Sequence, residues 1–316
     1  MTDSTMPAAM AGRPAPQRSA GHTLVRTLLS DRKALAGGII LLLAAAIALL
    51  APLIAPGDPN DFVGRPNLSP SAAHWFGTTS SGQDVLAQTV WGARISLSAG
   101  ILVGILTTAL GTVVGMTAGY LRGRVDEMLS LVINVFLIMP SLPLLIVLAA
   151  FLPPGHATIV LVLTVTGWAW PARVLRAQTL ALREKDFVIS AEMLGETRIR
   201  IVFAEILPNM LSIVAASFVG SVVYGIGAQA GLEFIGLGDT SAVSWGTNLY
   251  WAANNSSLLT GAWWTFVPSG ACIAVVAFAF SLLNYAIDEV TNPHLRSQRS
   301  LRRVLRRRAA QRRGRA

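Results

Sequence analysis

The sequence predicts an all-α, polytopic membrane protein with six transmembrane helices. Its 316 residues are 53% hydrophobic and only 13% charged, whereas about one-quarter of a typical soluble domain is charged. The apolar residues lie in long runs, and each run exceeds the roughly 20 residues that cross the hydrocarbon as a helix. Since lipid offers the backbone no hydrogen-bond partners, continuous apolar runs indicate helices rather than a barrel.

Six apolar runs are the predicted membrane spans. The first follows a polar arm that is too long for a signal peptide, so we expect an uncleaved anchor. The fifth is diluted by Ser, Gly and Gln but contains no charged residue. In chain order the spans are 35–56, 95–120, 128–152, 157–178, 210–232 and 265–287.

Arginine and lysine are distributed unevenly between the segments that flank the spans. They are frequent in 1–34, 121–127 and 173–208 and after residue 292, and the segments on the opposite side contain only two arginines. The positive-inside rule therefore predicts that both termini lie in the cytoplasm. The net charge of +9 comes mostly from the C-terminal tail. Its place beside a span favours contact with anionic lipid headgroups over nucleic acid.

These boundaries divide the chain into five predicted parts. They are a disordered, basic cytoplasmic N-terminus (1–34), the first transmembrane helix (35–56), an extracytoplasmic segment (57–94), a core with five transmembrane helices and a cytoplasmic loop at 183–208 (95–290), and an arginine-rich cytoplasmic tail (291–316).

Several kinds of chemistry are missing from the sequence. Lys33 and Lys185 are the only lysines, and neither lies in a Gly-rich phosphate loop, so the chain does not bind ATP in that way. The four histidines are scattered and the only cysteine, Cys272, lies in the last span, so no metal site is expected. No G-x-S-x-G motif is present. The sequence therefore predicts neither a catalytic residue nor an enzyme.

A self-powered secondary transporter is the less favoured alternative, because such proteins usually place ionisable residues within their spans. The polar candidates are few. Asn134 and Gln229 suit hydrogen bonding between packed helices, and Glu233 falls where the fifth span leaves the membrane. Arg173 and Arg176 lie near the inner end of the fourth span.

The cytoplasmic stretch "FVISAEMLGETRIRIVFAEILPN" (187–209) predicts two short helices around a glycine. In the second half, an apolar stripe falls at i, i+3, i+4 and i+7. Its residues are Ile199, Val202, Phe203 and Ile206. Pro208 suits the first turn of the span that follows, where its missing N–H costs nothing.

In the first half, Val188, Ala191 and Gly195 share a small-sided face. Gly195 permits a bend or a close backbone contact. Glu196 and Arg200 are spaced for a favourable i,i+4 pair. Two interpretations remain open on these grounds: a helix that merely links two spans, and a helix offered to another protein.

The stretch resembles the cytoplasmic signature loop of permease subunits of binding-protein-dependent ABC importers, which reads Glu-Ala-Ala, three residues, Gly, nine residues, two variable residues and Leu-Pro. Ile189-Ser190-Ala191 stand at the first three positions, followed by Gly195 and Leu207-Pro208. Ile189 is a clear departure from the family's pattern, and Ser190 is a mild one.

Three further stretches resemble the second permease of the dipeptide, oligopeptide and nickel group. They are "HWFGTTSSGQDVLAQTVWGARISLSAG" (74–100), "WAWPARVLRAQTLALREKDFV" (168–188) and "LEFIGLGDTSAVSWGTNL" (232–249). Thr79 and Gln83 replace the family's usual Asp and Arg. The resemblance extends from Asp31 to about Pro293.

The resemblance implies a type I ABC importer permease fold and a defined set of partners. These are a second homologous permease, two cytoplasmic ATPase subunits that bind the ATP, and an extracytoplasmic substrate-binding protein, so no cofactor is expected here. Peptides are the implied substrate, with nickel complexes and oligosaccharides as alternatives. The implied ATPase-coupling residues are Ser190, Ala191, Glu192, Gly195, Leu207, Pro208 and Asn209.

A substrate pathway would be lined by the less apolar faces of the second to fifth spans. Ser217, Ser221 and Tyr224 fall at i, i+4 and i+7 and so share one such face. Small residues at helix interfaces are the usual alternative explanation. Pro140 and Pro143 are positioned either to break the third span or only to kink it.

Overall fold

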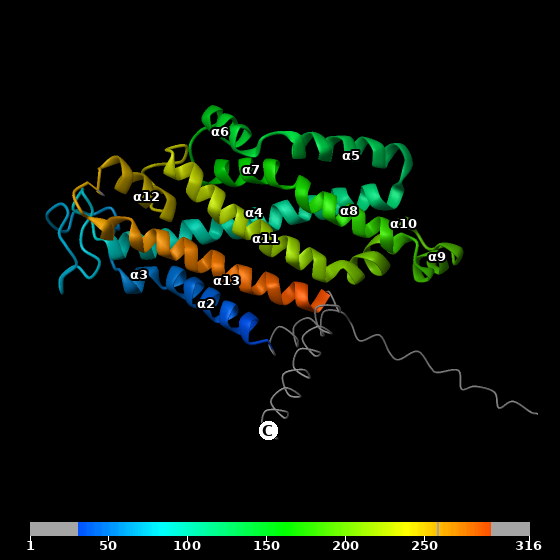
Figure 1. Cartoon of the computed structure of the whole chain (residues 1–316), viewed down its shortest axis with the longest axis horizontal. Coiled ribbons are helices and arrows are strands. Elements are labelled where there is room, and N and C mark those ends of the chain that lie inside the picture. Colours follow the sequence, from blue (N-terminus) through cyan, green and yellow to red (C-terminus); the bar gives the residue numbers. More distant parts are fainter. Residues whose placement is uncertain (1–30, 258, 292–316) are drawn as a thin grey trace, which may run out of the picture.

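The computed structural model describes residues 31–257 and 259–291, without the side chains of 288–291. Within these residues the protein is an elongated bundle of helices, which confirms the all-α fold class (Figure 1). The expected disordered arm and the arginine-rich tail lie almost wholly outside the described residues. Among residues 31–257 and 259–291, five helical segments are long and apolar enough to cross a membrane, or six if one bent pair forms a single span.

The elements follow one another with short connections, apart from the long segment between α3 and α4 (Figure 1). They are α2 (Arg32–Leu49), α3 (Ala51–Ile54), α4 (Val85–Leu121), α5 (Gly123–Ile138), α6 (Ser141–Phe151), α7 (His156–Gly167), α8 (Ala169–Arg183), α9 (Asp186–Met193), α10 (Arg198–Arg200), the π-helix η1 (Ile201–Ile206), α11 (Leu207–Phe234), α12 (Trp245–Asn254), the 3-10 turn η2 (Trp263–Thr265) and α13 (Val267–Thr291).

The central helix α4 begins ten residues before the predicted span. Asp84 caps it, because its side chain accepts a hydrogen bond from the backbone N–H of Ala87 at 2.9 Å. The last part of the expected extracytoplasmic segment (57–94) is therefore helical. Hydropathy alone placed the start too late because Gln88, Thr89 and Arg94 interrupt the apolar sequence within the first ten residues of the helix.

The third span is broken at the first of the two prolines. α5 and α6 meet at 90°. Met139 has the extended backbone that a residue before proline favours, and Pro140 opens α6. Pro143 lies within the first turn of α6, where a proline is tolerated.

Glycines let α4 pack closely against α8 and α11, its most extensive neighbours. Gly111, Gly115 and Gly119 face α8, and Gly100 and Gly104 face α11. A Cβ at any of the five would approach the neighbouring helix to within 2.3–2.7 Å. Small residues at such spacings allow membrane helices to associate through backbone contact.

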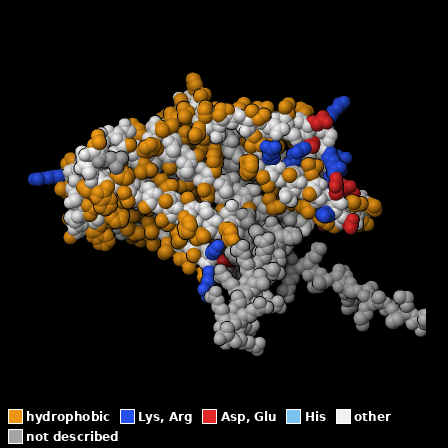
Figure 2. All heavy atoms as spheres, in the orientation of Figure 1, with side chains coloured by type: hydrophobic (Ala, Val, Ile, Leu, Met, Phe, Trp, Pro, Cys, Tyr) orange, Lys and Arg blue, Asp and Glu red, His pale blue; other side chains and the backbone are white. Residues whose placement is uncertain are grey.

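The two ends of the bundle differ in chemistry. Segment 57–84 and α12 lie at one end, and α9 and α10 lie at the other (Figure 1). Lys and Arg side chains gather around α9 and α10, whereas the sides of the bundle are mostly hydrophobic (Figure 2). This asymmetry matches the charge pattern of the sequence.

Candidate functional site

The candidate site at the charged end is built on α9, whose end is defined by Gly195. The N–H of Gly195 donates to the carbonyl of Glu192 and the N–H of Glu196 donates to that of Ala191, both at 3.1 Å. With φ at +75°, Gly195 completes the left-handed C-cap that glycine favours. A Cβ there would meet no atom within 4 Å, so Gly195 ends the helix and makes no close contact within this chain.

The inner face of α9 packs against the bundle. Val188 and Ala191 are buried in one cluster with Met116 of α4 and Met210 of α11. Ala191 is 8% exposed. The structure thus places Ala191 within the core of this chain, whereas the resemblance implied a contact with the ATPase. Its small side chain lets α9 lie close to the membrane helices.

Ser190 and Glu192 remain exposed at the surface. The carboxylate of Glu192 accepts a hydrogen bond from the hydroxyl of Tyr120 at 3.1 Å. Tyr120 lies in the last turn of α4 and its ring faces the Arg183 guanidinium at 5.2 Å. Glu192 therefore ties α9 to the end of α4, a contact that the sequence did not reveal.

The outer side of α9 and the adjoining helices exposes apolar side chains. Met193 and Leu194 are each 82% exposed, and Ile199 and Phe203 are 74% and 57% exposed. Together with Ile189, these residues are called the α9 patch. Sequence reasoning missed Met193 and Leu194 because they lie at a helix end, where helical periodicity gives no guide.

The predicted stripe of Ile199, Val202, Phe203 and Ile206 is wrong as a single face. The chain forms a π-helix at 201–206, whose wider turn buries Ile201 and Ile206, five residues apart. Ile199 and Phe203 consequently face outward. The wide turn precedes Pro208, whose ring would clash with the carbonyl four residues earlier in a regular helix.

Leu207, Pro208 and Asn209 join η1 to α11 without a break. The N–H of Leu207 donates to the carbonyl of Val202, and the Asn209 amide donates to the carbonyl of Glu205 at 2.7 Å. These bonds satisfy backbone groups at the junction. The signature loop is therefore continuous with the fifth span.

Ion pairs fix the surroundings of this site. Glu196 and Arg200 lie 3.1 Å apart, which confirms the predicted pair. Arg176 of α8 binds Asp126 of α5 through two hydrogen bonds of 2.5 and 2.8 Å. This bidentate pair explains Arg176 as a link between helices rather than part of a relay.

The predicted pathway residues lie in one cleft of about 620 Å³ between α5, α8, α11 and α13. Ser217, Ser221 and Tyr224 all line it. The Tyr224 and Thr166 hydroxyls are 3.1 Å apart. Asn284, which also lines the cleft, has a buried side-chain oxygen without a partner among the described residues. The break between α5 and α6 opens onto the same cleft, which Met139 also lines.

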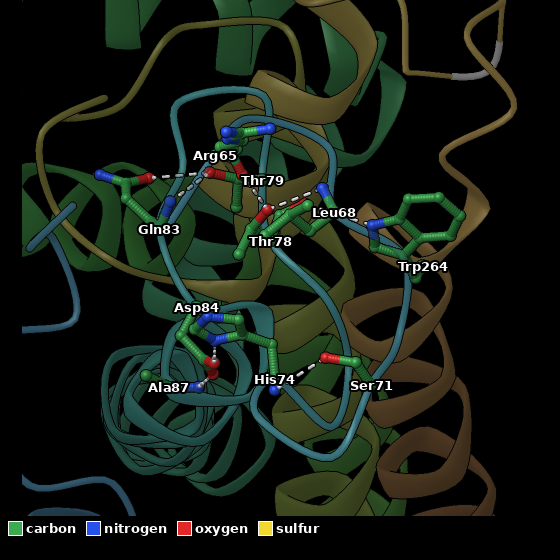
Figure 3. A network of polar contacts seen from close by, with 10 residues as sticks. All are labelled: Arg65, Leu68, Ser71, His74, Thr78, Thr79, Gln83, Asp84, Ala87 and Trp264. Carbon is green, nitrogen blue, oxygen red and sulfur yellow. Dashed lines mark hydrogen bonds and ion pairs between the residues drawn. The ribbon is translucent and has the colours of Figure 1, made fainter. Parts of the chain in front are cut away.

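Segment 57–84 is folded by a polar network at the opposite end (Figure 3). The Thr78 hydroxyl donates to the Arg65 carbonyl at 2.6 Å, and the Trp264 ring donates to the Thr78 carbonyl at 3.2 Å. His74 Nδ1 lies 3.0 Å from the carboxylate of Asp84, the residue that caps α4 (Figure 3). The segment is thereby fastened to both the start of α4 and η2.

Glu233 closes the junction of α11 and α12. It is 4% exposed and accepts hydrogen bonds from the Gln229 amide at 3.0 Å and from the Ser244 hydroxyl. Trp245 follows Ser244, and its ring donates to the Thr89 carbonyl of α4 at 3.0 Å. The Gln229 amide thus bonds to a residue of its own helix, and the expected hydrogen bond to a neighbouring helix is not found among the described residues. In the following loop, hydrogen bonds from Ser241 lower the pKa of Asp239 below its ordinary value.

Comparison with known proteins gives consistent matches. Residues 111–296 match the family described as "Binding-protein-dependent transport system inner membrane component". Residues 19–70 match the "N-terminal TM domain of oligopeptide transport permease C". Within the described residues, no cluster of acidic, histidine or cysteine side chains suits a metal ion.

Individual relatives cover most of the chain. The dipeptide transport system permease protein DppC of Bacillus subtilis is 34% identical over 275 residues, which is 86% of this chain and 85% of the relative. The oligopeptide permease protein OppC of Mycobacterium tuberculosis is 30% identical over 90% of this chain and 97% of its own. A chain of the MetNI methionine ABC transporter shares the fold, with a TM-score of 0.52 and 18% identity over 65% of this chain and 94% of that chain.

Proposed function

The chain belongs to the family of binding-protein-dependent transport system inner membrane components, and we propose that it forms half of a peptide pathway that partner ATPases drive through α9. Members of this family are permease subunits, and the ATPase activity resides in separate subunits. The relatives named above are dipeptide and oligopeptide permease proteins, which supports peptides as the substrate class.

The α9 patch is the observation that carries the proposal. Leu194 and Met193 are each 82% exposed at the charged end of the bundle. Burying one such side chain against a partner contributes about 1.5–3 kcal/mol. Exposed apolar side chains with a polar and charged surround suit a protein interface. A cytoplasmic ATPase subunit is the partner, since the cation-rich end is the cytoplasmic end by the positive-inside rule.

Coupling follows from how α9 is held. Its inner face is packed into the same cluster as α4 and α11, and Tyr120 ties Glu192 to α4. A displacement of α9 by ATPase closure therefore moves α11, which carries Ser217, Ser221 and Tyr224 in the cleft. The chain acts as a two-state element whose equilibrium is set by nucleotide bound to its partners.

The pathway would run through this cleft, which a second permease completes. None of the described residues that line it is charged. Its hydroxyl and amide groups are suited to hydrogen-bond a peptide backbone without selecting for side-chain charge. Selection among peptides then belongs to the extracytoplasmic binding protein.

Purification of the assembled complex tests this proposal. Leu194 has an ordinary helical backbone and projects into solvent, so Leu194→Arg should spare the fold of this chain. We expect the tagged variant to retain the second permease and lose the ATPase subunit. Leu259→Arg, at a leucine on the far end of the bundle that is 88% exposed, should retain both. Retention of the ATPase subunit by Leu194→Arg at the wild-type level would refute the proposed interface.

A further inference from the structure

A polar pocket of about 340 Å³ lies at the end of the bundle opposite α9. Its walls come from segment 57–84, the start of α4, the loop 240–243 and α12. We call it the amide pocket, because the carboxamides of Gln83, Gln88, Asn248 and Asn255 line it. None of the described residues in its lining is charged.

The amide groups present unused acceptors. The nitrogen of Gln88 donates to the Pro59 carbonyl at 2.6 Å, that of Asn248 to the Gln88 carbonyl at 3.1 Å, and that of Asn255 to the Ser80 hydroxyl. The three side-chain oxygens accept no hydrogen bond from any residue that the structure describes. The amide N–H groups therefore hold these side chains in place, and the amide oxygens can accept hydrogen bonds from N–H groups of a bound molecule.

Two aromatic side chains line the same pocket. Phe62 is 78% exposed and Trp251 is 47% exposed. The ring N–H of Trp251 donates to the Thr240 carbonyl at 2.9 Å, which holds the loop 240–243 in place. Exposed aromatics beside fixed polar groups are typical of binding hot spots.

The pocket is rigid before anything binds. In the network of Figure 3 the N–H of Gln83 donates to the Thr79 hydroxyl and the Trp264 ring donates to the Thr78 carbonyl. The N–H of Val85, the first residue of α4, donates to the Gly77 carbonyl at 3.1 Å. Gly82, with φ at +81°, approaches the Gly64 carbonyl so closely that a Cβ would lie 2.4 Å from its oxygen. A rigid wall of this kind lowers the entropy that a partner loses on binding.

The shape favours a protein segment over a free solute. A second hollow of about 530 Å³ adjoins the amide pocket and shares with it Asn60 and residues 241–243. The two together form one continuous surface that is larger than either hollow alone. The amide pocket shares no lining residue with the membrane cleft, so an occupant would sit beside the pathway rather than in it.

We propose that the amide pocket is the docking site on this subunit for a segment of the extracytoplasmic substrate-binding protein. Backbone N–H groups of that segment bind the free amide oxygens, and its apolar side chains cover Phe62 and Trp251. This inference rests on the importer function proposed above. It adds the place and chemistry of the docking contact.

Photocrosslinking and affinity measurements on the complete complex test this docking site. A benzophenone amino acid replaces Phe62 in one variant and Trp75 in another. Trp75 is 72% exposed in the same segment but lines neither hollow. Capture of a solute-binding protein, identified by mass spectrometry, is expected from position 62 and not from position 75. The captured protein, once purified, serves as the probe for affinity.

We expect Phe62→Ala and Trp251→Ala each to raise the Kd of this probe for the complex in nanodiscs by about tenfold. Trp75→Ala should leave the Kd unchanged. An unchanged Kd in both pocket variants, or an equal rise of the Kd in Trp75→Ala, would refute the proposed docking site without contradicting the importer function. A wild-type complex that contains its ATPases yet binds no solute-binding protein would overturn both.

Discussion

The close contact of the α4 glycines with α8 predicts how much a larger side chain at Gly115 lowers the free energy of unfolding. At Gly115, an added Cβ would lie 2.4 Å from the carbonyl oxygen of Ala172 in α8. The closest ordinary carbon–oxygen contact is about 3.3 Å, so the helices must separate by about 0.9 Å. The obstacle is backbone, which does not yield as a side chain would. Overpacking of this kind costs about 1–3 kcal/mol, offset by about 1 kcal/mol of helix propensity.

Gly220 of α11 provides the matched control, because a Cβ there meets nothing within 4 Å. We therefore expect Gly220→Ala to gain up to about 1 kcal/mol from helix propensity. Gly115→Ala should unfold about 1–3 kcal/mol more easily than Gly220→Ala. The free energy of unfolding in mixed SDS micelles measures both variants on one scale. Equal stability of the two would show that α4 and α8 do not touch at Gly115 in the membrane.

Three further variants probe the charged end. Leu194→Ala should weaken binding of the copurifying ATPase subunit about 7- to 60-fold, since 82% of that residue is exposed and complete burial of a leucine side chain contributes about 1.5–3 kcal/mol. Titration of the ATPase subunit against this variant and against the control Leu259→Ala checks the prediction. Equal affinities of the two variants would contradict it. Tyr120→Phe removes the bond to Glu192, so we expect ATP hydrolysis to continue with less transport per ATP; an unchanged ratio would count against the link. Gly195→Val should destabilise the end of α9 by at least about 1 kcal/mol more than Gly195→Asn, because valine avoids a φ of +75°; hydrogen exchange at Glu196 reports the difference, and identical protection would exclude the cap.

The sequence predicted the spans well, because hydropathy and helix length reflect the same bilayer constraint. The prolines of the third span indicated either a break or a kink, since proline acts on its own local backbone, and the 90° bend between α5 and α6 shows that it is a break. The start of α4 was predicted ten residues late, because Gln88, Thr89 and Arg94 interrupt the apolar run and an aspartate cap carries no hydropathy signal. The π-helix at 201–206 was missed because a period of 3.6 residues was assumed throughout.

Parts of the candidate sites depend on contacts between distant segments. Tyr120 and Glu192 are 72 residues apart in the chain, and nothing local to either residue indicates their bond. Ala191 was expected at a partner interface, but its small size serves packing within this chain. Ser217, Ser221 and Tyr224 were grouped correctly by helical spacing, while their neighbours from α5 and α8 required the tertiary structure.

Uptake of a labelled peptide into proteoliposomes is the most direct test of the central claim. The vesicles contain this chain, the second permease and both ATPases, with the binding protein on the side of segment 57–84. The account predicts uptake that requires ATP and the binding protein and is lost in Leu194→Arg. Uptake driven by a proton gradient without ATP, or undiminished uptake in Leu194→Arg, would contradict it.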